Sequence, residues 1–334
     1  MKILIFLIIT FVCTPLFLLS VEAKTVYIPE EISVEENAVK ATTIRNMSEI
    51  EIYRCFPIDI IFDSVYILDM FSCKVVKLSL KGELLGRFGS KGQAPGEFLG
   101  LFGISKFNEN IALTGKHKVI ICDKDLKYLR EIKLKERFHD LILATNNKIY
   151  FYNNPTYYNY YFTVYTDDFK YLKKFGIKNP NAKKKIITNS NYRYSSNIIR
   201  ETLYVPEENG IWVSFRNRYD LRYYKNEELV VDIKSKNQIF AASEEEFMGK
   251  KFKMYTTDYA ILIAKHEKQL YYCYIKGGNL YCDVFKFSEN YHLYRRLKFP
   301  FLYKKLAHFI DINFYGLRYS EDKENVFLDK IQIH

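Results

Sequence analysis

The sequence has few cysteines and none of the spacings that would make them structural. It contains 6 cysteines and 1 tryptophan among 334 residues. Five of the cysteines follow residue 23, an odd number at irregular intervals, and no two have the CxxC spacing of a zinc site. These absences exclude a disulfide framework or a zinc cluster as the basis of the fold.

Catalytic motifs are also missing. There is no GxSxG, HExxH, Walker or Rossmann motif, and no two of the 6 histidines share the spacing of metal ligands. His139 and Asp140 adjoin the start of a predicted strand, but adjacency in sequence does not make a catalytic dyad. We therefore expect no catalysis by this chain and no cofactor.

Long hydrophobic runs are confined to the first residues. Lys2 precedes the apolar run Ile3–Leu19, and a small-x-small cleavage site ends at Ala23. This pattern predicts a signal peptide over residues 1–23 and a mature domain over residues 24–334, exported to the periplasm, the cell surface or the medium. An uncleaved anchor is the alternative, because a run of this length is close to the shortest that spans a bilayer. We expect no transmembrane segment after cleavage.

Negative charge is scarce relative to positive charge. The chain has 50 Lys and Arg against 39 Asp and Glu, a net charge of +11, and 17% of its residues are aromatic. In the cytoplasm this combination would suggest nucleic-acid binding. Export places nucleic acid out of reach, so we expect no such partner. Two interpretations remain, a solvated lysine-rich surface and a basic face for an anionic glycan or a membrane surface.

What the sequence does contain is a repeat built of short strands. Residues 75–85 align without a gap with residues 119–129 at an offset of 44, and Tyr171-Leu172 takes the place of Tyr128-Leu129 in a third copy 43 positions later. Apolar and polar residues alternate within each copy, and turn residues separate the strands. A strand-built repeat of this length is typical of a β-propeller.

Six such units predict an all-β fold, a six-bladed β-propeller of four-stranded antiparallel blades. The last unit, from Ala307 onward, ends after three strands. An N-terminal strand, which we place within Thr25–Val34, would supply the fourth strand and close the ring. Closure of this kind removes exposed sheet edges.

The motif Asp69-x-x-Ser72-x-Lys74, a turn glycine and the glycine-spaced run 87–98 together resemble an NHL repeat. The whole chain is similar to the exported six-bladed β-propeller proteins of bacteria that carry degenerate NHL-like repeats. The match is good over residues 65–134 and weak elsewhere, and Ser72 and Lys74 replace the usual Asn and Arg. Asp69 itself is expected to accept hydrogen bonds from turn amides.

Two long insertions are the main functional clue. Residues 176–197 and 234–258 each join the outer strand of one blade to the inner strand of the next, so both lie on one face of the ring. Ser243 and Glu246 form a capping box, which predicts a short helix in the second insertion. Basic and aromatic residues suit anionic or sugar partners through ion pairs and stacking. The candidate binding residues are Lys183, Lys184, Lys185, Tyr192, Arg193, Tyr194, Lys250 and Lys251. Solvated loops without a ligand are the alternative.

One pair of cysteines is a candidate disulfide. Gly277 and Gly278 predict a two-residue hairpin turn, and counting outward from it places Cys273 directly opposite Cys282. Cross-strand neighbours have Cβ atoms about 5 Å apart. In an oxidising compartment the two could form a disulfide, and two reduced, half-buried thiols are the alternative.

Together these features predict an exported, monomeric binding or scaffold module that recognises a protein or an anionic glycan through the long loops on one face. A rigid ring that holds such loops still reduces the ordering entropy lost on binding. The alternative, from a different functional class, is a metal-dependent hydrolase or lyase with its site at the central channel.

Overall fold

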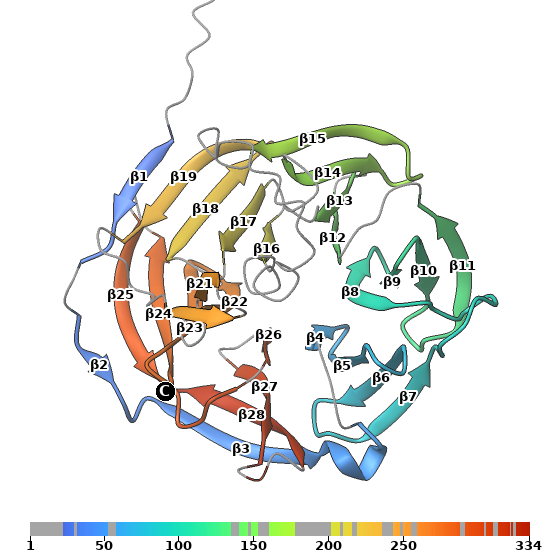
Figure 1. Cartoon of the computed structure of the whole chain (residues 1–334), viewed down its shortest axis with the longest axis horizontal. Helices are drawn as coiled ribbons and strands as arrows, with labels where there is room; N and C mark the ends of the chain where they lie inside the picture. The colour runs from blue at the N-terminus through green and yellow to red at the C-terminus, as the bar shows by residue number, and fades with distance from the viewer. Residues whose placement is uncertain are drawn as a thin grey trace, which may run out of the picture.

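The structure is a computed structural model, and its strands form a ring of six small sheets (Figure 1). It describes residues 23–29, 32–52, 58–134, 140–145, 148–152, 160–177, 202–207, 210–215, 219–235, 243–247, 250–254, 259–287, 291–303, 305–309, 313–320, 322 and 325–334. The predicted six-bladed β-propeller is confirmed. Among these residues no helix is long and apolar enough to cross a membrane.

Blades 1 to 3 each contain four antiparallel strands that follow one another from the centre to the rim. Blade 1 consists of β4 (Ile58–Ile61), β5 (Ser64–Asp69), β6 (Lys74–Ser79) and β7 (Leu84–Phe88). Blade 2 consists of β8 (Leu101–Phe107), β9 (Asn110–Gly115), β10 (Lys118–Cys122) and β11 (Tyr128–Lys133). Blade 3 consists of β12 (Asp140–Thr145), β13 (Lys148–Tyr152), β14 (Tyr160–Thr166) and β15 (Tyr171–Ile177).

Blades 4 to 6 each include a strand from the N-terminal segment. Blade 4 consists of β16 (Thr202–Glu207), β17 (Gly210–Phe215), β18 (Asp220–Lys225), β19 (Glu228–Lys234) and β1 (Lys24–Tyr27). Blade 5 consists of β22 (Tyr259–His266), β23 (Gln269–Lys276), β24 (Asn279–Phe287), β25 (Tyr291–Lys298) and β2 (Val34–Glu35). Blade 6 consists of β26 (Lys305–Phe309), β27 (Asn313–Tyr319), β28 (Val326–Ile333) and β3 (Val39–Asn46), which leads into the 3₁₀ turn η1 (Met47–Ile50).

The N-terminal segment runs around the rim before blade 1 begins (blue in Figure 1). β3 pairs antiparallel with β28, so an N-terminal strand closes the ring as predicted. The predicted position within Thr25–Val34 is wrong, because β1 and β2 instead pair in parallel with β19 and β25 as fifth strands outside blades 4 and 5. Pro29 lies between them and cannot donate to a ladder, which prevents one continuous strand there.

A buried carboxylate fixes the closing strand to blade 6. Asp329 of β28 is fully buried and accepts hydrogen bonds from the Thr43 hydroxyl of β3 (2.7 Å), from Arg318 Nε (2.6 Å) and from the Tyr303 hydroxyl (3.0 Å). Burial and the adjacent Asp329 raise the pKa of Tyr303. The ion pair and hydrogen bonds offset the desolvation penalty of the buried carboxylate, and they link three strands at the closure.

The hydrophobic core lies between adjacent blades. Tyr66 and Val75 of blade 1 pack with Ile104, Leu113 and Ile120 of blade 2 in one hydrophobic cluster. Similar clusters join blades 2 and 3, blades 4 and 5, blades 5 and 6, and blades 6 and 1. Each buried side chain of this size contributes about 1.5–3 kcal/mol. The ring is therefore held by contacts between sheets, and closure completes them.

The part of the repeat that aligns without a gap contains the turn that joins the third and fourth strands of each blade in blades 1 to 3. Ser79, Asp123 and Thr166 occupy the same position, and each side chain accepts a hydrogen bond from the amide four residues later. Asp69 behaves as predicted, because its Oδ1 accepts the amides of Phe71 (3.0 Å) and Ser72 (3.2 Å) in the turn that follows β5. These polar side chains fix the geometry of the turns by accepting hydrogen bonds from turn amides.

Candidate binding surfaces

The second insertion contains a β-hairpin made of β20 (Ser243–Phe247) and β21 (Lys250–Met254). The predicted helix at Ser243 and Glu246 is therefore wrong. The register places Lys253 opposite Glu244 and Lys251 opposite Glu246. Opposite charges on facing strands are favourable, whereas a helix would have crowded consecutive glutamates on one turn. The hairpin lies in the connection from β19 to β22, and β21 falls within the outline of the ring (Figure 1).

The candidate binding residues are only partly covered by the structure. Lys250 and Lys251 are the first two residues of β21. The others, Lys183, Lys184, Lys185, Tyr192, Arg193 and Tyr194, lie outside the described residues. Their connection, from β15 to β16, is equivalent to the one that carries the hairpin, because both join an outer strand to the next inner strand. Because strands alternate in direction within four-stranded blades, both connections start and end at the same face of the ring.

One inner strand carries a carboxyl group whose pKa is strongly raised. Asp59 lies on β4, the innermost strand of blade 1, and its Oδ1 accepts the amide of Ile60 (2.8 Å). Burial raises the pKa of the Asp59 carboxyl to about 7. Within the described ranges no three His, Cys, Asp or Glu residues are grouped so that they could hold a metal ion. His139 lies outside those ranges, and Asp140 begins β12.

The raised pKa of Asp59 predicts a pH-dependent stability. The folded carboxyl keeps its proton up to about pH 7, while the unfolded one loses it near its ordinary pKa of 3.8. The stability that the protonated Asp59 carboxyl gives the folded state is therefore fully present below about pH 4 and is lost as the pH rises through 7. We expect Asp59→Asn to stabilise the protein by about 2–4 kcal/mol above pH 7 and to have no effect near pH 4. Urea unfolding at both pH values measures this, and equal effects at both would contradict it.

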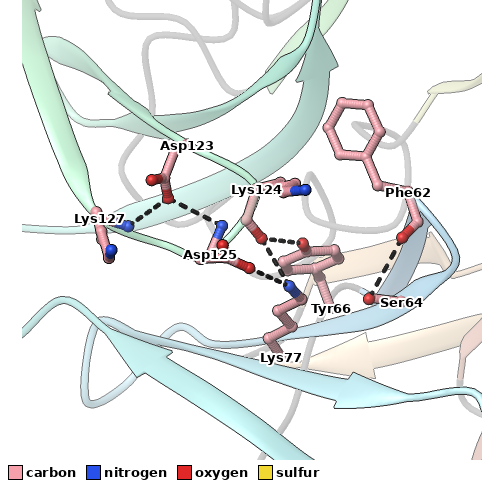
Figure 2. Close-up of polar contacts among 8 residues, drawn as sticks. All are labelled: Phe62, Ser64, Tyr66, Lys77, Asp123, Lys124, Asp125 and Lys127. Atoms are coloured by element: carbon pink, nitrogen blue, oxygen red, sulfur yellow. Dashed lines mark hydrogen bonds and ion pairs between the residues drawn. The ribbon is translucent and has the colours of Figure 1, made fainter.

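Blade 1 holds the β10–β11 turn of blade 2, as Figure 2 shows. The Tyr66 hydroxyl donates to the Lys124 carbonyl (2.9 Å). Lys77 Nζ donates to the same carbonyl (2.8 Å) and to Asp125 Oδ1 (3.1 Å). Burial is the main cause that raises the pKa of Tyr66, and the negative charge of Asp125 raises it further. Because Lys77 is engaged in these contacts, this polar cluster holds blade 1 against blade 2. We do not propose it as a ligand site.

The predicted register of the cysteine pair is correct. Cys273 and Cys282 face each other across β23 and β24, and both are fully buried with free thiols. Gly277 and Gly278 both have positive φ, as in a type I′ turn. Counting from that turn makes the cysteines a non-hydrogen-bonded pair with Cα atoms about 4.5 Å apart, within the range for a disulfide. Disulfide formation stays a prediction.

Sequence reasoning missed a set of apolar residues on the rim. The outer strands of blades 1 to 3 begin with adjacent apolar residues that are 41–56% exposed. They are Leu84 and Leu85 of β7, Tyr128 and Leu129 of β11, and Tyr171 and Leu172 of β15. Their spacing is that of the repeat, and this could have identified them, since adjacent apolar residues in a strand cannot both face one side.

Solved structures with the same architecture have very different sequences. One is a protein from Bacteroides fragilis NCTC 9343 described as a "putative exported protein", with a TM-score of 0.62, 12% identity, and coverage of 93% of this chain and 99% of that one. Another is the Pan2 WD40 domain of Neurospora crassa, with a TM-score of 0.51, 8% identity, and coverage of 90% and 97%. At these identities the similarity shows the fold alone.

Sequence comparison identifies the family. No curated protein matches this chain at a significant level. The model of the DUF5128 family, described as a 6-bladed beta-propeller, matches residues 47–300, which is most of the chain and five of the six blades in full or in large part. This chain belongs to the DUF5128 family of 6-bladed beta-propellers.

Proposed function

We propose that the protein is an exported binding or scaffold propeller that recognises a protein or an anionic glycan through the face carrying its two long insertions. The observation that supports the proposal is the strand order, in which the two long insertions join β15 to β16 and β19 to β22 in adjacent blades. The signal-like residues 1–23 support export to the periplasm or the cell surface.

The chemistry of this face supports an anionic partner. The first insertion contains Lys183, Lys184 and Lys185 followed by Tyr192, Arg193 and Tyr194, and β21 begins with two lysines. Guanidinium and ammonium groups pair with carboxylates or sulfates, and tyrosine rings stack on sugars or peptide side chains. A closed ring supports these loops on a scaffold that loses little conformational entropy when a ligand binds.

The test compares two charge-reversal variants with the same net charge. One carries glutamate in place of Lys183, Lys184 and Lys185. The other carries glutamate at three exposed lysines in the turns between third and fourth strands, on the opposite face, which are Lys81, Lys124 and Lys127. Binding to immobilised heparin and to proteins of an envelope extract is measured for both. We expect at least roughly tenfold weaker binding for the first variant only, about 1.4 kcal/mol or more. Equal weakening by both variants would contradict recognition through the insertion face.

A further inference from the structure

The N-terminal segment shows how this propeller accepts an added strand. β1 joins β19 in parallel over the pairs from Lys24↔Val231 to Tyr27↔Lys234. β2 joins β25 in parallel, and Figure 1 shows both outside the four strands of their blades. The outer edge of a blade thus binds an extended segment through its backbone groups, which is strand addition within one chain.

Charge contributes to this contact on blade 5. Arg295 of β25 donates to the Glu35 carboxylate through Nε (3.0 Å), and Lys298 Nζ lies 2.9 Å from Glu36 Oε1. The hydrogen bond and ion pair with Glu36 raise the pKa of Lys298. An acidic extended segment is therefore matched to an outer strand that carries basic residues.

β11, the outer strand of blade 2, has the same basic character. Arg130 and Lys133 are exposed, and Glu131 is paired with Lys118 Nζ at 2.8 Å, which leaves the positive charges dominant. Among the described residues β11 pairs only with β10, and no strand lies on its outer side.

The backbone of β11 is also oriented for pairing. The Leu134 amide donates inward to the His117 carbonyl (2.8 Å). Because inward and outward groups alternate along an antiparallel strand, the amides and carbonyls of Glu131 and Lys133 point outward. They form a short row of backbone donors and acceptors of the kind that added strands bind.

Exposed apolar residues mark the same edge. Tyr128 is 42% exposed and Leu129 is 50% exposed, both at the start of β11. In β25 the equivalent of Tyr128 is Leu293, which is half-buried against the core of blades 4 and 5, and the equivalent of Leu129 is Tyr294, which is 48% exposed. A bare strand edge with adjacent large apolar residues is a site for association with another chain.

We propose that β11 is the docking site for an extended, acidic segment of a partner protein, which adds to blade 2 as a parallel fifth strand. Its backbone would pair with the outward groups of Glu131 and Lys133, and its carboxylates would meet Arg130 and Lys133. This surface lies on the rim and is separate from the insertion face, so either proposal can fail while the other holds.

The test uses a fluorescent peptide with the sequence of residues 31–38, which includes β2, the short strand that the chain itself adds to blade 5. Lys133→Pro removes an outward amide and a charge, and Lys133→Ala removes the charge alone. Proline is tolerated on an edge strand where its nitrogen faces solvent, and a thermal melt of each variant checks folding. Anisotropy titration is expected to show binding that Lys133→Pro weakens at least roughly tenfold and Lys133→Ala about threefold or less.

Hydrogen exchange locates the bound peptide. The amides of Glu131 and Lys133 are expected to gain protection when the peptide binds, with no change in β25. Three results would overturn the proposal. These are absence of peptide binding, equal weakening by the proline and alanine variants, and new protection confined to β25, where the peptide would merely replace β2.

Discussion

Asp283→Ala is expected to lower the free energy of unfolding by about 3–5 kcal/mol. Asp283 of β24 is 0% exposed, and its carboxylate accepts hydrogen bonds from Arg296 Nε (2.6 Å) and Nη2 (2.7 Å) and from the Tyr219 hydroxyl (2.6 Å). The Tyr274 hydroxyl lies 3.4 Å away. Tyr219 precedes β18, so one carboxylate joins blade 4 to blade 5.

The effect is large because the partner groups are mostly shielded from water: Tyr219 is buried, and the Arg296 side chain is 15% exposed. Burial lowers the pKa of Arg296, but the hydrogen bonds and charge of Asp283 more than reverse this, so the guanidinium stays charged inside the protein. Removing the carboxylate leaves that charge uncompensated. Urea unfolding measures the loss, and Asp125→Ala, at a 56% exposed side chain, is the control, with an expected cost below about 1 kcal/mol. Similar small losses for both variants would show that the Asp283 network contributes little.

Deleting residues 24–46 is expected to abolish cooperative unfolding. The deletion removes β3 and leaves blade 6 with three strands, so all of β28 becomes an open edge. It also removes Thr43 from Asp329 and Val39 from the core between blades 5 and 6. An open edge of this length favours aggregation, and an incomplete ring loses contacts between blades 6 and 1.

The matched control deletes residues 24–37 and keeps β3. It exposes the outer edges of blades 4 and 5 and removes Ile28, a buried side chain worth about 1.5–3 kcal/mol. We expect this shorter deletion to remain a monomer that melts cooperatively at a lower temperature. Size-exclusion chromatography and circular-dichroism melts measure both. A cooperative melt of the longer deletion, close to that of the intact chain, would show that β3 is dispensable for closure.

The repeat could be detected in the sequence only for the blades that have similar apolar residues at equivalent core positions. The third strand of each blade has an equivalent position opposite the fourth residue of the second strand. It holds Val76 and Ile120 in blades 1 and 2, and it holds Thr163, Arg222, Asp283 and Asp329 in blades 3 to 6. A shift from apolar to polar or charged residues at one position obscures the alignment, although the strands and their pairing persist.

The turn glycine of the repeat shows a second reason for divergence. Gly82 and its equivalents Leu126 and Phe169 all have positive φ. A Cβ at Gly82 would lie 3.0 Å from the Ile44 carbonyl oxygen of the closing strand, so a side chain there would press against that backbone. Leu126 is buried between blades 1 and 2, and Phe169 packs between blades 2 and 3. Packing offsets the backbone strain of these residues.

Other features depended on long-range pairing that local patterns do not encode. The hairpin at Gly277 and the Cys273–Cys282 register were predictable because a two-residue turn fixes the count. The places of β1 and β2 were not, because each is a short strand that forms by joining an edge more than 200 residues away in the chain. The capping box at Ser243 misled for the same reason, since pairing with β21 outweighed a local helix signal.

Elemental analysis of residues 24–334, purified without chelator and melted with and without EDTA, tests the binding-module account most directly. The account predicts no stoichiometric metal and the same melting temperature in both conditions. Stoichiometric calcium or zinc with a melt that EDTA lowers would contradict it, and would favour a metal-dependent hydrolase or lyase with its site at the central channel.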